Sequence, residues 1–189
     1  KTLSHRRDEF VLATKAGHPS TGLSGRAWTK KTMSDSIDHS LVKLNTDYVD
    51  LLQIHAYDIS APPPAYVIQA VLDAKDAGKT RFVGYSGENK DAEWAIDSGL
   101  FDTLQTSFSI VDQRARQRIL GEAKSKETGV IAKRPIANAV WGAAISGAQE
   151  NNFSGSNLDR YKRARAMIDL GSIHGAPKSP VVLSLGFVL

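Results

Sequence analysis

Apolar residues along the chain follow two patterns, short continuous runs and stripes at helical spacing. The runs are rich in β-branched and aliphatic residues, and a polar loop follows each one. This is the pattern of strands buried on both faces of a parallel sheet. The first run reads FVLATK and the second DYVDLLQIH. The predicted strands cover residues 10–15, 48–55, 81–86, 103–108 and 129–134.

The segments between these runs carry apolar residues every three or four positions, which predicts amphipathic helices. One such stripe consists of Met33, Ile37, Leu41 and Leu44. Asp112 is expected to cap the N-terminus of a longer helix, because a carboxylate can accept the hydrogen bonds of the first free backbone N–H groups. The predicted helices cover residues 31–44, 65–77, 91–98, 112–126, 157–170 and 179–189.

Strands and helices alternate at short intervals, which predicts a parallel sheet with helical crossovers. The chain is therefore expected to have an α/β fold of the (β/α)8 TIM-barrel type. Residues 17–29 and 143–155 break the alternation after strand ends, and we expect long loops there, the second of them mobile. Since no linker or change of composition divides the chain, we expect a single domain over residues 1–189.

Two residues that can transfer or hold protons stand at the ends of neighbouring strands. Lys15 ends the first apolar run and His55 ends the second. In α/β barrels such positions point into the active-site mouth, so the pair indicates proton chemistry. A lysine at this position could also form a Schiff base with a carbonyl compound. Taken singly, a snorkelling lysine and a hydrogen-bonded core histidine explain these residues equally well.

Composition limits the possible functions. The chain has no cysteine, and its five histidines are scattered, so neither a disulfide framework nor a metal site is expected. The basic stretches 114–118 and 160–165 lie at helical spacing without aromatic residues between them. We expect solvated helix faces there and no nucleic-acid interface. No apolar run reaches about 18 residues, so no membrane span is expected, and we expect a cytoplasmic protein.

Five segments in order resemble the aldo-keto reductase family. Together they extend over most of the chain, and their order and spacing carry the resemblance. The segments are RDEFVLATK (7–15), SIDHSLVKL followed by DYVDLLQIH (36–55), GKTRFVGYS (78–86), LQTSF (104–108) and IAKRPI (131–136).

The resemblance implies a barrel enzyme that reduces a small-molecule aldehyde or ketone with NADPH, without metal or flavin. The family's active site is a tetrad of Asp, Tyr, Lys and His. Lys15 matches the lysine that lowers the pKa of the tyrosine, and His55 matches the histidine that orients the carbonyl.

The same resemblance implies how the cofactor is held. Ser86 and Gln105 match residues that hydrogen-bond the nicotinamide carboxamide, and Phe108 matches the aromatic residue that stacks on the nicotinamide ring. The loop near the cofactor's diphosphate is matched by Arg134, Pro135, Ile136 and Ala137.

The chain departs from the family in several places. The family's aspartate and tyrosine lie upstream of the lysine, but none of the fourteen residues before Lys15 is tyrosine. Five strands are predicted where a closed barrel has eight, so we expect an incomplete barrel with its ends missing. Produced alone, the chain should bind NADPH poorly and reduce no aldehyde, unless Tyr57 or Tyr85 replaces the family's tyrosine as the proton donor. Gly87 stands where an asparagine is common, and Gly186 where an arginine is common.

One other function stays open. Barrels that resemble this family can also serve as cofactor-binding regulatory subunits, and a fold alone does not exclude that role. A serine hydrolase is not expected, because the sequence GYSGE at 84–88 has glutamate where the nucleophile elbow requires glycine. Neither the identity of the carbonyl substrate nor the oligomeric state can be read from the sequence.

Overall fold

The protein is described by a computed structural model that covers residues 4–19, 24–55, 57, 62–171 and 174–189. Five strands form one sheet in the order β1-β2-β3-β4-β5, and the pairs from β1 to β4 are parallel. Each predicted strand is present, with its ends shifted by three residues or fewer. The strands are β1 (Ala13–Ala16), β2 (Val49–His55), β3 (Thr80–Ser86), β4 (Thr103–Ser107) and β5 (Gly129–Lys133).

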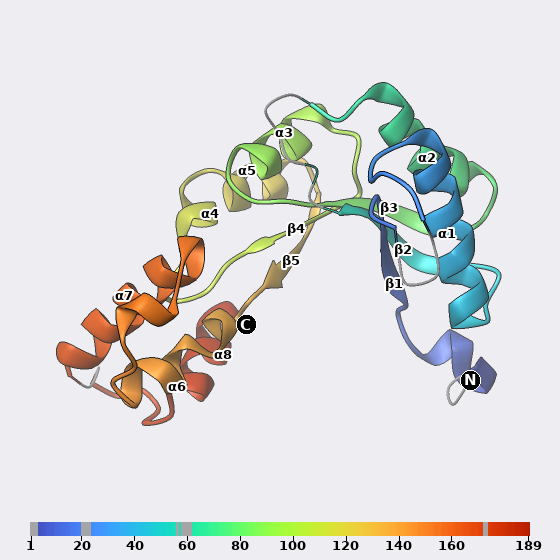
Figure 1. Ribbon diagram of the computed structural model, residues 1–189. Coiled ribbons are helices and arrows are strands. Elements are labelled where there is room, and N and C mark those ends of the chain that lie inside the picture. Colours follow the sequence, from blue (N-terminus) through green and yellow to red (C-terminus); the bar gives the residue numbers. More distant parts are fainter. Residues whose placement is uncertain (1–3, 20–23, 56, 58–61, 172–173) are drawn as a thin grey trace. The chain divides into compact units, whose positions relative to one another are not determined.

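Helices lie between the strands and after β5 (Figure 1). Most predicted helices are confirmed to within two residues. Short 3-10 helices cover Ser4–Glu9, Ala137–Ala139 and Glu150–Asn152. The α-helices are α1 (Lys30–Leu44), α2 (Ala65–Asp76), α3 (Lys90–Ser98), α4 (Arg114–Gln117), α5 (Ile119–Ser125), α6 (Val140–Ile145), α7 (Gly155–Asp169) and α8 (Pro180–Val188).

The chain forms two compact units. The first unit contains Lys1–Gln105 and Gly121–Ile131, and the second contains Thr106–Leu120 and Ala132–Leu189. The single domain expected from the sequence stays a prediction. No described helix is long and apolar enough to cross a membrane.

The core of the first unit lies between the sheet and its helices. Figure 1 shows α1 and α2 side by side next to β1, β2 and β3. The helix α1 contacts β1, and α2 contacts β2 and β3. Met33 and Ile37 of α1 and Val71 of α2 are buried, which confirms the predicted stripes at these positions. Ile54 and Tyr85 lie opposite each other in the register of β2 and β3, and neither is exposed.

An ion cluster joins the segments at the amino ends of β1, β2 and β3. Asp50 in β2 accepts hydrogen bonds from Arg7 at 2.8 Å, from Arg81 at 3.0 Å and from the backbone N–H of Leu12 at 2.8 Å. Burial favours a higher pKa for the Asp50 carboxyl, but these donors outweigh it and the pKa is lowered. The cluster lies at the end of the strands opposite to Lys15 and His55, and its role is structural.

In the second unit the predicted N-terminal cap at Asp112 is wrong, and so is the single helix over residues 112–126. The helix is split into α4 and α5, with Arg118 between them at φ −135°. Gln113 precedes α4 and makes no side-chain cap bond. Asp112 instead binds Arg114 through two hydrogen bonds of 2.8 Å. Its carboxylate is therefore engaged by guanidinium groups and does not cap the helix.

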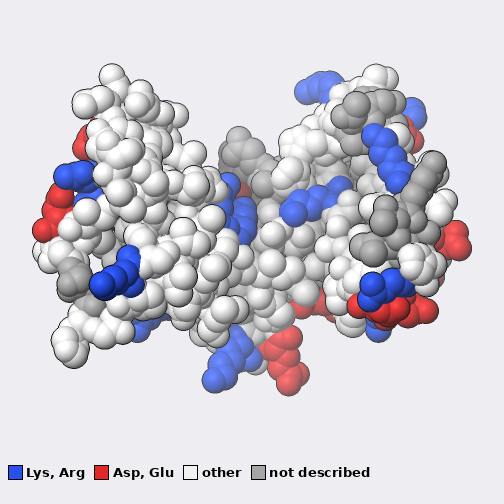
Figure 2. Space-filling view, turned by 90° about the horizontal axis from the view of Figure 1, so that it is seen from below, with Lys and Arg blue, Asp and Glu red and all other residues white. Residues whose placement is uncertain are grey.

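Arg160 of α7 also contradicts a prediction, because it does not lie on a solvated helix face. Only 1% of its surface is exposed, and its Nη2 donates to Asp112 at 3.0 Å. Further hydrogen bonds go to the side chains of Ser156 and Asn157. A guanidinium can be buried when it is paired and hydrogen-bonded in this way, and pairing cannot be read from helical spacing. Among the described residues visible in Figure 2, basic and acidic side chains are interspersed on the face drawn.

The segment after β5 contains more regular secondary structure than the sequence predicted. The predicted loop at 143–155 contains the end of α6 and the 3-10 helix Glu150–Asn152. Its residues help to cover an apolar core around Trp141, Ala144 and Tyr161. Phe153 stacks on Tyr161 with ring centroids 4.5 Å apart, which holds the segment against α7.

Candidate functional site

Lys15, His55, Ser86 and Gln105, predicted from the sequence, occupy four consecutive strands of the first unit. Lys15 lies one residue before the end of β1, while His55 and Ser86 are the last residues of β2 and β3. Gln105 is in β4. His55 is opposite Ser86 in the register, and Ser86 is opposite Gln105, so the three form a row across neighbouring strands. Adjacent strands lie about 4.8 Å apart, so these residues are within contact range of one another toward the carboxyl ends of the strands.

A second row lies below the first on the same face of the sheet. It runs from Lys15 through Gln53 and Gly84 to Thr103. Gln53, Gly84 and Thr103 are each two residues before a member of the first row, and residues two apart point to the same face. Lys15 therefore shares a face with His55, whereas the intervening row, which contains Ile54 and Tyr85, faces the opposite side.

The shared face contains polar atoms whose hydrogen-bonding capacity is unused. Gln53 is 2% exposed, and its Nε2 has no partner among the described residues. The same holds for the buried Thr103 Oγ1 and Gln105 Oε1. Gly84 lies between Gln53 and Thr103, and a Cβ there would meet Thr103 Oγ1 at 2.3 Å. Since buried polar groups are normally satisfied, the face has donors and an acceptor for a polar ligand or water.

An aromatic cluster adjoins His55 at the carboxyl ends of β1 and β2. The imidazole of His18 packs edge-on against His55 with centroids 5.1 Å apart, and against Trp28 at 4.8 Å. Trp28 in turn contacts Tyr57 at 5.2 Å. His18 and Trp28 belong to the predicted long loop 17–29, whose four residues 20–23 lie outside the described part. The sequence indicated the position of this loop, but not that its imidazole would contact His55.

Gly17 makes this packing possible. Its φ of +132° is strained for any residue with a Cβ, and a Cβ there would lie 1.9 Å from the Trp28 ring. The backbone N–H of Trp28 donates to the Gly17 carbonyl at 2.8 Å. The glycine therefore brings the indole directly over the backbone that follows Lys15.

We expect Gly17→Ala to lower the free energy of unfolding by about 1–3 kcal/mol, because it forces a strained backbone and displaces Trp28. Urea unfolding followed by circular dichroism measures the change. Gly78→Ala is a matched control, since Gly78 also has a positive φ but a Cβ there would meet no atom within 4 Å. An equal loss in both variants would show that strain alone, and not contact with Trp28, accounts for the effect.

Tyr85 cannot replace the family's acid on the face that holds Lys15. It lies in the intervening row, is 0% exposed, and packs against Trp94 at 5.6 Å and Phe101 at 5.4 Å. Burial raises the pKa of its hydroxyl well above the usual value, and the nearby Asp91 adds to the effect. Of the two tyrosines considered from the sequence, only Tyr57 lies in the cluster that reaches His55.

Gly87, which departs from the family's asparagine, has a local explanation. A Cβ at Gly87 would lie 2.5 Å from the ring of Tyr85 and 2.9 Å from the Cβ of Asp91. The buried Tyr85 ring therefore occupies the space that a larger residue would need. The backbone N–H of Gly87 donates to the Gln105 carbonyl at 3.1 Å, which extends the pairing of β3 with β4 beyond Ser86.

The other predicted cofactor residues belong to the second unit. Phe108 is half-buried, and its ring lies 5.3 Å from that of Phe187 in α8. Its N–H donates to the carbonyl of Lys133 at the end of β5. Arg134 donates to the hydroxyl of Ser107 at 2.6 Å. Phe108 and Arg134 thus lie near each other along the paired ends of β4 and β5.

The loop from Arg134 to Ala139 is held in an unusual backbone conformation. Arg134, Ala137, Asn138 and Ala139 all have φ between 55° and 60°. Ile136, between Arg134 and the other three, has φ −96°, and Val140 after them is right-handed at φ −60°. The backbone N–H groups of Ala137 and Ala139 donate within the loop, to the carbonyls of Arg134 at 2.8 Å and Ile136 at 3.0 Å. The loop is therefore closed by its own hydrogen bonds. In the first unit, the unpaired Gln105 Oε1 can accept a hydrogen bond from an amide N–H.

No group of three or more histidine, cysteine, aspartate or glutamate side chains with metal-binding geometry occurs among the described residues.

Comparison with known proteins shows which family the chain belongs to. The sequence profile of the Aldo/keto reductase family matches residues 1–189. L-galactose dehydrogenase of Arabidopsis thaliana is 31% identical over 144 residues, covering 72% of this chain and 44% of the relative. The uncharacterized oxidoreductase YqkF of Bacillus subtilis is 29% identical over 177 residues, covering 88% of this chain and 57% of the relative.

Solved structures support the fold. The aldo-keto reductase AKR11C1 from Bacillus halodurans, in its holo form, superposes with a TM-score of 0.64 at 26% identity. The match covers 74% of this chain and 47% of that protein. The chain spans about half the length of the relatives it matches. The fold is that of a TIM barrel, of which the described sheet is an open, five-stranded part. This chain belongs to the aldo/keto reductase family.

Proposed function

We propose that this protein reduces an aldehyde or ketone to an alcohol with NADPH, acting as an oxidoreductase. The observation that carries the proposal is the common face shared by Lys15, His55, Ser86 and Gln105 at the carboxyl ends of β1 to β4. In barrels of this type that end of the strands forms the active site. The family relationship supports the same activity. A cytoplasmic location and a small-molecule substrate belong to the proposal.

The chemistry needs a hydride donor and a proton donor. Bound NADPH supplies the hydride that reduces the carbonyl carbon. In the proposal His55 donates a hydrogen bond to the carbonyl oxygen and orients it. The ammonium of Lys15 favours the ionised form of a neighbouring acid and so eases transfer of its proton to the same oxygen. Tyr57 lies in the aromatic cluster beside His55, and it is the described tyrosine to test as that acid.

Cofactor binding is assigned to the residues that fit its parts. Ser86 and Gln105 would hold the carboxamide, with the unpaired Gln105 Oε1 as the acceptor for the amide N–H. Phe108 would stack on the nicotinamide ring. Around the diphosphate the proposal places Arg134, Pro135, Ile136 and Ala137, and the family relationship is what supports this assignment.

We expect Gln105→Met to weaken NADPH binding by about 3- to 10-fold, the loss of one hydrogen bond. Gln53→Met is the matched control. It removes an amide of the same size from the row below on the same face, and should leave the affinity unchanged. Titration of NADPH fluorescence measures both. If the two variants lost affinity equally, the binding would depend on the face as a whole and not on Gln105.

Turnover tests the function itself. The chain, and a longer form that includes an upstream segment, would be incubated with NADPH and benzaldehyde while NADPH absorbance is followed. Benzyl alcohol formed in equal amount to the NADPH consumed supports the proposal, and Tyr57→Phe tells whether the acid lies within this chain. If both forms bind NADPH but neither turns over any of several aldehydes and ketones, the proposal fails. The protein is then better described as a cofactor-binding regulatory subunit.

A further inference from the structure

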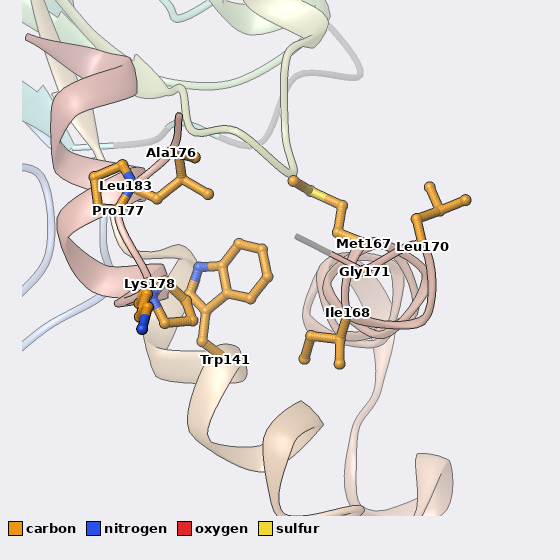
Figure 3. A pocket seen from close by; sticks show the side chains of 10 residues that line it. Trp141, Met167, Ile168, Leu170, Gly171, Ala176, Pro177, Lys178 and Leu183 are labelled. Carbon is orange, nitrogen blue, oxygen red and sulfur yellow. The ribbon is translucent and has the colours of Figure 1, made fainter. Parts of the chain in front are cut away.

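A hollow of about 270 Å³ beside Trp141 in the second unit is lined mainly by apolar side chains (Figure 3). Leu170 and Lys178 in its lining are exposed, so the hollow is open to water and selects no particular ligand. The first unit is different, because a ring contact there reaches a residue of the candidate active site.

His18 is placed to hold the ring of His55. Both side chains are exposed, so burial does not fix either of them. The two imidazoles meet edge to face, with ring centroids 5.1 Å apart and 78° between the ring planes. Aromatic rings attract each other in this arrangement and at this distance. The contact therefore restricts the rotamers that the exposed His55 side chain can adopt.

Trp28 gives His18 a fixed support. The two rings pack with centroids 4.8 Å apart. Trp28 has a φ of 63°, a left-handed conformation that is unfavourable for a residue with a large side chain. Its backbone N–H donates to the Gly17 carbonyl at 2.8 Å, and its carbonyl accepts from the hydroxyl of Tyr66 in α2 at 2.9 Å. Such strain persists only where the surrounding structure enforces it, and it is concentrated at functional sites.

We propose that His18 is a positioning residue for the reaction. In contact with both Trp28 and His55, it holds the imidazole of His55 in the orientation from which that ring donates a hydrogen bond to the carbonyl oxygen. A misplaced catalytic group lowers the rate even when the group itself is present. His18 needs only its ring for this role and exchanges no proton with the substrate. The inference rests on the proposed function, because His55 acts on a carbonyl only if the protein reduces one.

The orientation of His55 can be measured by NMR without turnover. In protein labelled with ¹³C and ¹⁵N at histidine, the couplings of Hα to the two Hβ protons differ when one χ1 rotamer dominates and converge when rotamers average. The couplings of His55 should differ in wild type and in His18→Phe, which keeps a ring in place. They should converge in His18→Ala, and also in Trp28→Ala, which removes the support of His18. His5→Ala, at an exposed histidine of the 3-10 helix Ser4–Glu9, is the matched control and should change nothing.

Kinetics then tests whether the orientation matters for the reaction. In the longer form that includes an upstream segment, His18→Ala should lower kcat with benzaldehyde by about 3- to 10-fold, the factor that corresponds to one aromatic pair. KM and NADPH affinity should change little, because the variant lowers only the fraction of bound complexes that can react. His18→Phe should restore kcat, and His5→Ala should leave it unchanged.

Two results would overturn the proposal. Converged couplings of His55 in wild type, or differing couplings in His18→Ala, would show that His18 does not hold the ring. A kcat in His18→Phe as low as in His18→Ala would mean that the imidazole nitrogens act on the substrate directly. If the couplings respond as expected but the wild-type protein reduces no carbonyl compound, the proposed function fails while the effect of His18 on the His55 ring stands.

Discussion

Replacing Lys15 with methionine is expected to lower kcat for carbonyl reduction by about a hundredfold or more, with little change in NADPH affinity. Methionine keeps the length and much of the volume of the side chain but removes the positive charge. That charge favours the ionised form of the acid that protonates the carbonyl oxygen. General acid catalysis typically contributes about 10²–10⁴-fold, so most of this factor should be lost. The expectation rests on the proposed function.

Steady-state kinetics with benzaldehyde measures the change, together with an NADPH titration of each variant. Lys124→Met is the matched control, since Lys124 is an exposed residue of α5 and should not affect turnover. A Lys15→Met variant that kept more than about a tenth of the wild-type kcat would contradict the assigned role, because the loss would be below about 1.4 kcal/mol. Loss of NADPH binding in the same variant would assign Lys15 to the cofactor instead.

Asp112→Asn is expected to cost the largest amount of stability, about 3–5 kcal/mol in the free energy of unfolding. The substitution preserves shape but leaves the guanidinium of Arg160 without its counter-charge. Asp112 and Arg160 are each 1% exposed, so solvent cannot compensate. Asp169→Asn is the matched control, because Asp169 pairs with Arg165 at 3.1 Å on the surface, where both are about half exposed. Exposed pairs contribute about 0–1 kcal/mol.

The same carboxylate should make stability depend on pH. Burial alone would raise the pKa of Asp112, but Arg114 and Arg160 outweigh it and hold the pKa below its usual value. A group with a lowered pKa in the folded state stabilises the protein above its unfolded pKa, about 3.9. That contribution is lost as the pH falls from about 4 through the folded pKa. Urea unfolding between neutral and acid pH should show a shallower decline in Asp112→Asn than in wild type. Parallel curves would contradict the lowered pKa.

Local sequence patterns were enough to predict the strands, most of the helices and the strand-end positions of Lys15 and His55. These features follow from local pattern, since a strand buried on both faces must be apolar throughout and a packed helix must carry a stripe. The alternation of side chains then fixes which strand residues share a face. The pairing register of β2, β3 and β4 then places His55, Ser86 and Gln105, predicted separately, in one row.

The pairing of polar and aromatic groups across long sequence separations could not be predicted in this way and is known from the folded structure. Asp112 has the sequence signature of a helix cap, yet Arg160, 48 residues away, binds its carboxylate and leaves it unable to cap the helix. Likewise, the loop residue His18 contacts His55. A sequence pattern records the average environment of a residue along its own helix or strand. Which partner a charge or ring finds depends on the packing of segments that are distant in the chain.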